Sequence, residues 1–261
     1  MKKQFFLGVG AQKSGTTWLH RYLSRYPNVN LGRTKEYHIW DALYLKDCRK
    51  YLRYLPRFSI RSTTQFEMQR IPGAYERYFK NKVKGDVNST GDITPGYAGL
   101  EAKHFELIKQ RLEGKGFDVK VIFLMRDPFE RCWSQARMDK RKLGLTESVV
   151  ECLGRAYTTH ACSFRTEYNK TIGQIEQVFS PDKIYYGIYE EMFTPEKIVE
   201  LSKFCGVDAD ISFAEKTFNA YADKNEMLPD ELRAEIIRFY AHVYDFCHKR
   251  FPQTKTLWSR R

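Results

Sequence analysis

The sequence predicts an α/β fold, a three-layer sandwich in which helices cover both faces of a central parallel sheet. Three apolar segments, each followed by residues at helical spacing, indicate this: residues 5–9, 119–125 and 183–189. Strands that alternate with helices form parallel sheets, because a helix carries the chain back to the end of the sheet at which the previous strand began. The length suits one such unit, so we expect a single domain over residues 1–261.

Local signals divide the first unit into a strand, a loop and a helix. The apolar residues 5–9 are followed by residues 10–15, a loop that begins and ends with glycine. Residues 16–25 have apolar side chains at helical spacing, and Pro27 ends the helix because its ring excludes a further helical turn. We expect the same strand–loop–helix order again later in the chain.

The second helix has a defined start and end. Asp127 follows the second strand and is suited to cap the helix, and Pro128 fits its first turn. The basic residues 140–142 precede Gly144, which is a typical carboxyl-terminal pattern. We therefore expect one helix between these two signals.

The remaining segments are expected to be mainly helical. Residues 168–175 have apolar side chains at helical spacing, and helices are predicted at about 196–205 and at 230–249. Residues 45–85 are expected to form helices with loops, and they are a candidate insertion over the site.

Composition excludes a disordered chain and points to an anionic ligand. Hydrophobic residues make up 42% and charged residues 29%, as in globular proteins. The net charge is +12, from 44 Lys and Arg against 32 Asp and Glu, and such a balance attracts anions. A polyphosphorylated cofactor, a sulfated glycan, an anionic membrane and nucleic acid all fit. The basic residues are scattered, which argues against a nucleic-acid-binding arm.

The cysteines and the amino-terminal residues indicate whether the chain binds a metal and where in the cell it is located. None of the six cysteines forms a C-x-x-C pair, so no zinc site and no other metal site is expected. The apolar residues 5–9 are too short for a signal peptide or a membrane span. We expect a cytoplasmic protein with no transmembrane segment in this chain, or a Golgi-lumen protein if an upstream anchor was removed.

The loop between the first strand and the first helix is suited to bind phosphate. It reads Gly-Ala-Gln-Lys-Ser-Gly-Thr-Thr over residues 10–17. Glycines let the backbone approach an anion closely, and the helix amino terminus offers N–H groups and a positive dipole. Lys13 adds a charge, and the hydroxyls add donors. The loop therefore predicts an anion site.

This loop departs from that of nucleotide kinases. The kinase pattern G-x-x-x-x-G-K-[ST] would have a lysine at position 16, where this chain has Thr16, and the lysine has moved to Lys13. The second strand ends at Arg126, where a metal-dependent NTPase would supply an acidic residue. The site is thus expected to hold an anion with protein charges and without an obligatory metal.

Residues 12–18 resemble the 5′-phosphosulfate loop of sulfotransferases that use 3′-phosphoadenosine 5′-phosphosulfate (PAPS). The resemblance implies a P-loop, nucleotide-kinase-like sulfotransferase fold and PAPS as cofactor, with adenosine 3′,5′-bisphosphate (PAP) as product. It also implies that Lys13 stabilises charge on the bridging oxygen as the S–O bond breaks. The cofactor-binding residues that it implies are Gln12, Lys13, Ser14, Gly15, Thr16, Thr17 and Trp18.

The segment from Arg126 to Ser134 resembles the 3′-phosphate motif of the same family. The resemblance implies that Arg126 and Ser134 hold the 3′-phosphate, and a planar guanidinium suits phosphate oxygens. We expect Arg131 and Arg137 to be solvated helix charges. Two anchors in this order, each after a strand, favour one nucleotide bound between them.

Residues 35–41, Lys-Glu-Tyr-His-Ile-Trp-Asp, resemble a segment of glycan sulfotransferases, especially the heparan sulfate 3-O-type and N-type enzymes. The resemblance implies that Glu36 is the general base, because the acceptor hydroxyl becomes acidic only as sulfur bonds to it. Asp41 and His38 would orient the acceptor or Glu36. His38 is also the rival base, since cytosolic small-molecule sulfotransferases use a histidine.

Two further correspondences are looser. Residues 91–97 resemble the family segment E-K-T-P-x-Y, in which Thr94 and Tyr97 would line the acceptor cleft or form a proline turn. Ile93 stands where the glycan enzymes have a lysine, which suggests a more distant, bacterial-type branch. Residues 219–224 correspond to a loop over the 3′-phosphate, with Lys224 as a candidate contact.

The sequence thus favours a sulfotransferase that moves a sulfuryl group from PAPS to a hydroxyl or amine of a small molecule or glycan. The positive charge allows an anionic carbohydrate and does not require nucleic acid as a partner. Two alternatives stay open: a divergent P-loop kinase, which would need Mg²⁺ and ATP, and a basic nucleic-acid-binding protein, whose affinity would depend steeply on salt.

Overall fold

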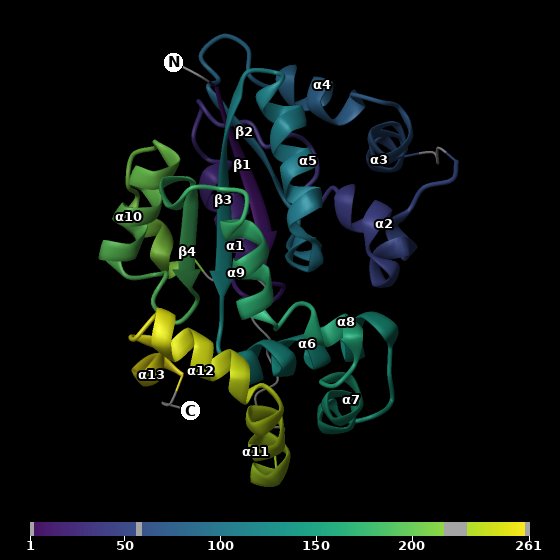
Figure 1. The fold of residues 1–261 in the computed structure, drawn as a ribbon, viewed down its shortest axis with the longest axis vertical. Helices are drawn as coiled ribbons and strands as arrows, with labels where there is room; N and C mark the ends of the chain where they lie inside the picture. Colours follow the sequence, from purple (N-terminus) through teal and green to yellow (C-terminus); the bar gives the residue numbers. More distant parts are fainter. Residues whose placement is uncertain (1–2, 56–58, 217–228, 259–261) are drawn as a thin grey trace.

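A computed structural model describes residues 3–55, 59–216 and 229–258 (Figure 1). The loop correspondence at residues 219–224 lies outside the described residues. Within them, no helix is both long and apolar enough to span a bilayer.

The core of the fold is a parallel sheet of four strands in the order β2-β1-β3-β4. The strands are β1 (Lys3–Gly10), β2 (Ser89–Ile93), β3 (Phe117–Met125) and β4 (Ile184–Ile188). Three of them are the strands that the apolar segments predict. β2 is not among the predicted strands, and its sequence, Ser-Thr-Gly-Asp-Ile, is short and largely polar. It forms at the edge of the sheet because every one of its residues is buried against β1 and the neighbouring helices.

Alternating side chains of β1 face two separate apolar layers. Phe5, Leu7 and Val9 belong to a large cluster that includes residues of α5 (Ala102–Glu113) and α9 (Tyr168–Glu176). Phe6 belongs to a second cluster, with residues of α1 (Thr16–Leu23) and α10 (Pro195–Cys205). Figure 1 shows α5 and α9 on the same side of the sheet. The predicted three-layer sandwich is confirmed.

The remaining helices lie around one end and one edge of this sheet (Figure 1). Beyond the arrowheads of the strands are α6 (Pro128–Leu143), α7 (Val149–Ala156), α8 (His160–Ser163), α11 (Asp230–Phe239), α12 (Ala241–Arg250) and α13 (Thr254–Leu257). At the edge beyond α5 lie α2 (Trp40–Tyr44), α3 (Ile60–Arg70) and α4 (Ala74–Lys80). The described parts of residues 45–85, which are 45–55 and 59–85, therefore form helices with loops, as the sequence indicates.

The start and end of α6 match their predicted signals. The Asp127 carboxylate accepts a hydrogen bond from the Glu130 N–H at 3.1 Å, and Gly144 ends the helix with a φ of 62°. The single helix expected at 230–249 is wrong in one respect: the chain breaks at Tyr240 into α11 and α12. The Tyr240 side chain is buried and donates a hydrogen bond to the Tyr157 carbonyl at 2.6 Å, which fixes the break.

The expectation that Arg131 is solvated is also wrong, because its side chain is fully buried. Its guanidinium contacts the Gln135 Oε1 at 2.8 Å and the sulfurs of Cys132 and Cys162 at 3.3 and 2.7 Å. Burial raises the pKa of the Cys132 thiol, but the hydrogen bond with Cys162 and the charge of Arg131 outweigh it and lower the pKa to about 5. The Cys132 thiolate thus balances the buried guanidinium, and neither Cys132 nor Cys162 forms a disulfide.

Candidate active site

The strand order places two chain turns beside each other. The chain moves from β1 to β2 on one side and then to β3 on the other, so the carboxyl ends of β1 and β3 flank the switch point of the sheet. In open α/β sheets, ligands bind at the carboxyl ends of the strands next to such a point. The loop at residues 10–15 leaves β1 here, and Arg126 leaves β3 here.

The loop after β1 forms an anion cradle. Lys13 and Gly15 have left-handed backbone angles, with φ of 72° and 90°, and α1 begins at Thr16. The Ser14 side chain is fully buried, and its Oγ has no hydrogen-bond partner within the described part of the chain. A buried hydroxyl without a partner is costly unless a ligand supplies one. A phosphate or sulfate oxygen would fit that role.

The electrostatics around Lys13 favour an anion. Burial is the largest cause that lowers the pKa of Lys13, to about 8, and the charges of Arg141 and Arg126 add to it. Like charges that gather around a buried ammonium destabilise its charged form. A bound anion would reverse this effect, so the cluster is prepared to receive negative charge.

Arg126 reaches back from the second turn to the first. Its Nη1 lies 3.5 Å from the Lys13 carbonyl oxygen, and its Nη2 lies 3.0 Å from the Glu130 Oε2. The guanidinium carbon lies 4.7 Å from the centre of the Tyr189 ring. Ser134 follows Glu130 by one turn of α6 and is half-buried. The two predicted anchors therefore lie side by side rather than in separate parts of the fold.

The predicted base segment forms a chain of charged groups. The His38 Nδ1 lies 2.7 Å from the Asp41 Oδ2, and its Nε2 lies 3.3 Å from the Glu36 Oε2. Asp41 is fully buried, and a Cβ at Gly96 would overlap its carboxylate, so this approach requires glycine there. Lys35 also pairs with Glu36. The structure thus brings Glu36, His38 and Asp41 into one network.

The protonation of this network follows from its contacts. Burial lowers the pKa of His38, but the hydrogen bonds to Asp41 and Glu36 outweigh it, so the net shift is upward. Burial raises the pKa of Glu36, but the contacts with His38 and Lys35 outweigh it and lower the pKa to about 2. Glu36 is thus an anion at neutral pH, and the two carboxylates favour the charged form of the His38 ring.

Comparison with known proteins decides the family. The profile of the sulfotransferase domain matches residues 3–227. The chain belongs to the sulfotransferase family. A comparison with curated proteins finds no match.

Solved sulfotransferases share this fold. A sulfotransferase from Alicyclobacillus acidocaldarius aligns over 92% of both chains, with 22% identity and a TM-score of 0.57. A sulfotransferase domain from the curacin biosynthetic pathway aligns over 93% of this chain and 97% of that chain, with 17% identity and a TM-score of 0.53. At these identities the likeness supports the fold alone, and it agrees with the predicted P-loop-like sulfotransferase architecture.

Three residues of this sulfotransferase that are predicted to contact the donor or the acceptor have side chains buried in the protein interior. Trp18 stacks on Tyr22 with ring centroids 4.9 Å apart and donates to the Phe213 carbonyl at 3.2 Å. Thr94 and Tyr97 are fully buried, and both hydroxyls bind Asp92 at 2.6 Å. A contact between these side chains and a ligand stays a prediction. The half-buried Gln12 and Thr17 lie in the loop or the first turn of α1, and the Thr16 side chain is buried.

Ile93, which stands where glycan sulfotransferases have a lysine, supplies no charge. Ile93 is fully buried in the second apolar cluster and packs directly over Gly8 of β1. Its side chain therefore points away from the base segment, since alternate residues of a strand face opposite sides. The cations nearest to Glu36 come from elsewhere: Lys35 pairs with its carboxylate, and the Arg61 Nη2 lies 3.3 Å from its carbonyl oxygen.

Two residues near the candidate site are not marked as site residues by any sequence motif. Tyr189 stacks with Arg126 and belongs to no motif, whereas Asp92 gathers three hydroxyls and lies in the segment 91–97, where only Thr94 and Tyr97 are predicted site residues. The predicted strand 183–189 ends in a tyrosine, and this place at the carboxyl end of a strand is the signal that could identify Tyr189. Asp92 lies within β2, which the sequence does not predict, so its burial could not be inferred from the sequence.

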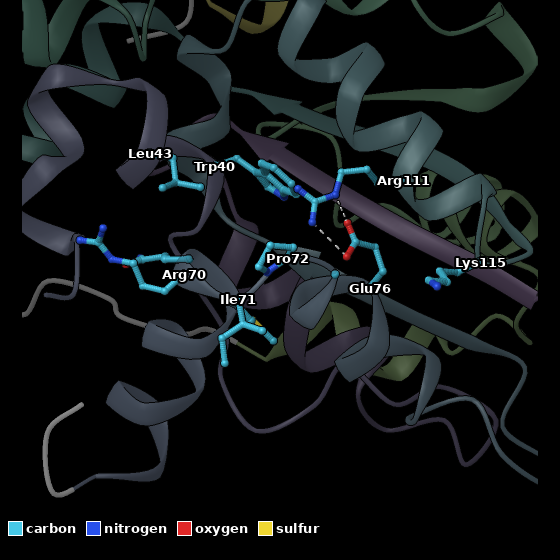
Figure 2. Close-up of a pocket in the computed structure, with 11 residues that line it drawn as sticks. Trp40, Leu43, Arg70, Ile71, Pro72, Glu76, Arg111 and Lys115 are labelled. Atoms are coloured by element: carbon cyan, nitrogen blue, oxygen red, sulfur yellow. Dashed lines mark hydrogen bonds and ion pairs between the residues drawn. The ribbon is translucent and has the colours of Figure 1, made fainter. Parts of the chain in front are cut away.

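A cavity of about 480 Å³ lies apart from these anchors, between α2, the α3–α4 segment and α5 (Figure 2). Its lining contains Trp40 and the ion pair of Arg111 with Glu76, and Figure 2 shows this pair beside the Trp40 ring. It contains none of the residues predicted to bind the donor. This cavity is thus separate from the turns that follow β1 and β3.

Proposed function

We propose that this sulfotransferase transfers a sulfuryl group from PAPS to a hydroxyl or amine of a carbohydrate acceptor. The observation that carries the proposal is the approach of Arg126 to the Lys13 carbonyl, which makes one nucleotide with charge at both ends the natural ligand of the two turns. The unpartnered Ser14 hydroxyl supports an anion in the loop. The family match supports the reaction class but leaves donor and acceptor open.

The proposed donor contacts divide between the two turns. Residues 12–17, together with the backbone of Trp18, would hold the phosphosulfate end, and Arg126 and Ser134 would hold the 3′-phosphate. PAPS supplies the sulfuryl group and a stable leaving phosphate. Lys13 and the loop N–H groups hold the negative charge of that phosphate, which is electrostatic stabilisation by groups already in place. No metal is needed for this charge balance.

Glu36 is the proposed base, and the network supports it over His38. The hydrogen bonds to Asp41 and Glu36 raise the pKa of His38, which favours the charged ring, and a charged imidazolium has no free nitrogen to accept a proton. Glu36 is ionised, and as sulfur bonds to the acceptor oxygen the hydroxyl proton becomes acidic enough for a carboxylate of low pKa to accept it. His38 and Asp41 would then hold Glu36 in place.

The basic charge of the chain bears on the acceptor. The net charge of +12 favours an acceptor that carries carboxylate or sulfate groups, such as an anionic glycan. We further propose one domain over the whole chain, acting in the cytoplasm or, behind an upstream anchor, in the Golgi lumen, with no nucleic-acid partner.

A transfer assay with sulfur-labelled PAPS tests the function. Purified protein is incubated with PAPS and with a panel of neutral and anionic oligosaccharides, with and without EDTA. We expect labelled product and an equal amount of PAP, unaffected by EDTA. Hydrolysis of ATP that requires Mg²⁺, without any transfer from PAPS, would favour the kinase alternative. Salt-dependent binding of DNA or RNA, without binding of PAP, would favour the nucleic-acid alternative.

Binding of PAP is expected to weaken as pH rises above about 8. Burial and the charges of Arg141 and Arg126 lower the pKa of Lys13 to about 8, and a bound anion raises it again. Lys13 must therefore take up a proton when PAP binds at higher pH, and this uptake costs affinity. Titration calorimetry at pH 8.5 in two buffers of different ionisation enthalpy should detect the proton.

A Lys13→Met variant is the control for this measurement. It should bind PAP more weakly at pH 7 and show no proton uptake at pH 8.5. If the parent protein binds PAP equally well from pH 7 to pH 9, Lys13 is not next to the anion.

A further inference from the structure

The backbone at His38 has an unusual conformation that the surroundings must enforce. His38 has a φ of 54°, in the left-handed region, which few residues other than glycine adopt. Such a conformation persists only where neighbouring contacts fix it, and it is concentrated at functional sites. Here it lets the ring lie between Glu36 and Asp41. The contacts that hold residues 37–39 therefore decide the geometry of the proposed base.

The N–H groups on both sides of His38 bind hydroxyls of the turn that follows β2. The Tyr37 N–H donates to the Thr94 Oγ1 at 3.0 Å, and the Ile39 N–H donates to the Tyr97 hydroxyl at 3.4 Å. Both hydroxyls in turn donate to Asp92, Thr94 to Oδ1 and Tyr97 to Oδ2, each at 2.6 Å. One buried carboxylate is thus linked to two backbone N–H groups of the base segment.

The charge of Asp92 fixes the direction of every hydrogen bond in this network. An ionised carboxylate only accepts, so each hydroxyl must give its single proton to Asp92. The lone pairs of the Thr94 and Tyr97 oxygens are then free to accept from the two N–H groups. Burial raises the pKa of Asp92 to about 6 even though the hydroxyls lower it, so the group is ionised at pH 7.

The carbonyl groups of the same segment are held from the opposite side. The Gln65 Nε2 donates to the Tyr37 carbonyl at 2.8 Å, and the Gln69 Nε2 donates to the His38 carbonyl at 2.8 Å. Both glutamines lie on α3, four residues apart and hence on one face. The segment is therefore fixed through its N–H groups by the turn that follows β2, and through its carbonyls by α3.

We propose that Asp92 is a positioning residue of the transfer reaction, which acts through Thr94 and Tyr97 on the backbone on either side of His38 and so holds His38 between Glu36 and Asp41. This inference rests on the proposed function, because it assigns Asp92 to the base segment of that reaction. A carboxylate that served only to stabilise the fold would need no connection to these two N–H groups.

Tyr75 provides a matched control within the same network. Its hydroxyl also donates to Asp92, at 3.1 Å, and it is equally buried, but it makes no hydrogen bond to the backbone of residues 37–39. Tyr75→Phe thus removes one hydrogen bond of the carboxylate and leaves both connections to the base segment. A loss of stability without a loss of turnover is expected from it.

The test compares Thr94→Val, Thr94→Ser and Tyr75→Phe with the parent protein. Valine keeps the shape of threonine and removes the hydroxyl, whereas serine keeps the hydroxyl. We expect Thr94→Val to lower kcat at least about tenfold, since small misplacements of a catalytic group have effects of this order or larger. The KM for PAPS and the thermal shift caused by PAP should change less than about twofold. Thr94→Ser should recover most of the turnover.

The outcomes separate this inference from the proposed function. If the parent protein transfers sulfur and Thr94→Val retains its kcat, or Tyr75→Phe loses as much turnover as Thr94→Val, the positioning role is wrong and the function stands. If the parent protein transfers no sulfur from PAPS, both fail. Should Thr94→Val not fold, Tyr97→Phe replaces it: this variant keeps the ring, removes the acceptor of the Ile39 N–H, and should lower kcat in the same way.

Discussion

Replacing Glu36 with glutamine is expected to lower kcat by a factor of about 10³ while PAP still binds. Glutamine keeps the shape of glutamate but has no basic oxygen, so the acceptor hydroxyl loses its proton acceptor. The His38 ring would also face an amide instead of a carboxylate at 3.3 Å. Steady-state transfer from labelled PAPS measures the loss, and a thermal shift with PAP shows that the donor site remains.

Glu113→Gln is the matched control for this variant. Glu113 is exposed at the carboxyl end of α5, so the same change of charge there should leave both kcat and PAP binding unaltered. Full turnover by Glu36→Gln would reject the base assignment and leave the donor site standing. In that case His38→Asn would be the next variant, because His38 is the rival base in the same network.

Replacing Arg126 with alanine is expected to weaken PAP binding by about 10- to 100-fold, since a hydrogen bond to a charged group contributes about 1.5–3 kcal/mol. The variant removes the guanidinium that reaches the Lys13 carbonyl, and it leaves the Glu130 carboxylate near the proposed phosphate. Repulsion from Glu130 should add to the loss. A thermal-shift titration with PAP, followed by calorimetry, measures the change in Kd.

Arg155→Ala controls for the loss of one positive charge. Arg155 lies on α7 with an exposed side chain that pairs with Glu147, so its removal should leave the Kd for PAP within about twofold of the parent value. An Arg126→Ala protein that binds PAP as tightly as the parent would show that the two turns do not share one nucleotide. The donor assignment would then fail even if the chain transfers sulfur from another donor.

The sequence was sufficient for elements whose signal is local. β1, β3 and β4 are apolar runs, and α6 has a capping aspartate, a first-turn proline and a terminal glycine, so each could be predicted from its own residues. β2 could not, because its burial depends on β1 and on partners far along the chain. Asp92 lies in this strand, and the hydroxyl of Tyr75 reaches it from α4.

The same distinction holds for the candidate site. The loop at residues 10–15, Arg126 and Glu36 could be predicted because each belongs to a short motif. The glutamines of α3 could not, since Gln65 and Gln69 are common polar residues whose role depends on how α3 packs against the base segment. For Arg131, helical spacing alone gave the wrong environment, because the sulfur of Cys162 comes from another helix.

If Arg126 holds the ribose phosphate as proposed, its ion pair with Glu130 competes with that phosphate in the ligand-free protein. The guanidinium already holds a carboxylate at 3.0 Å, so an incoming nucleotide must exchange one anion for another. A nucleotide with a phosphate on the ribose can make this exchange at little cost, because it replaces the interaction that it breaks. A nucleotide without that phosphate would leave the ion pair intact and gain no contact with Arg126, so it would bind more weakly than the proposed donor.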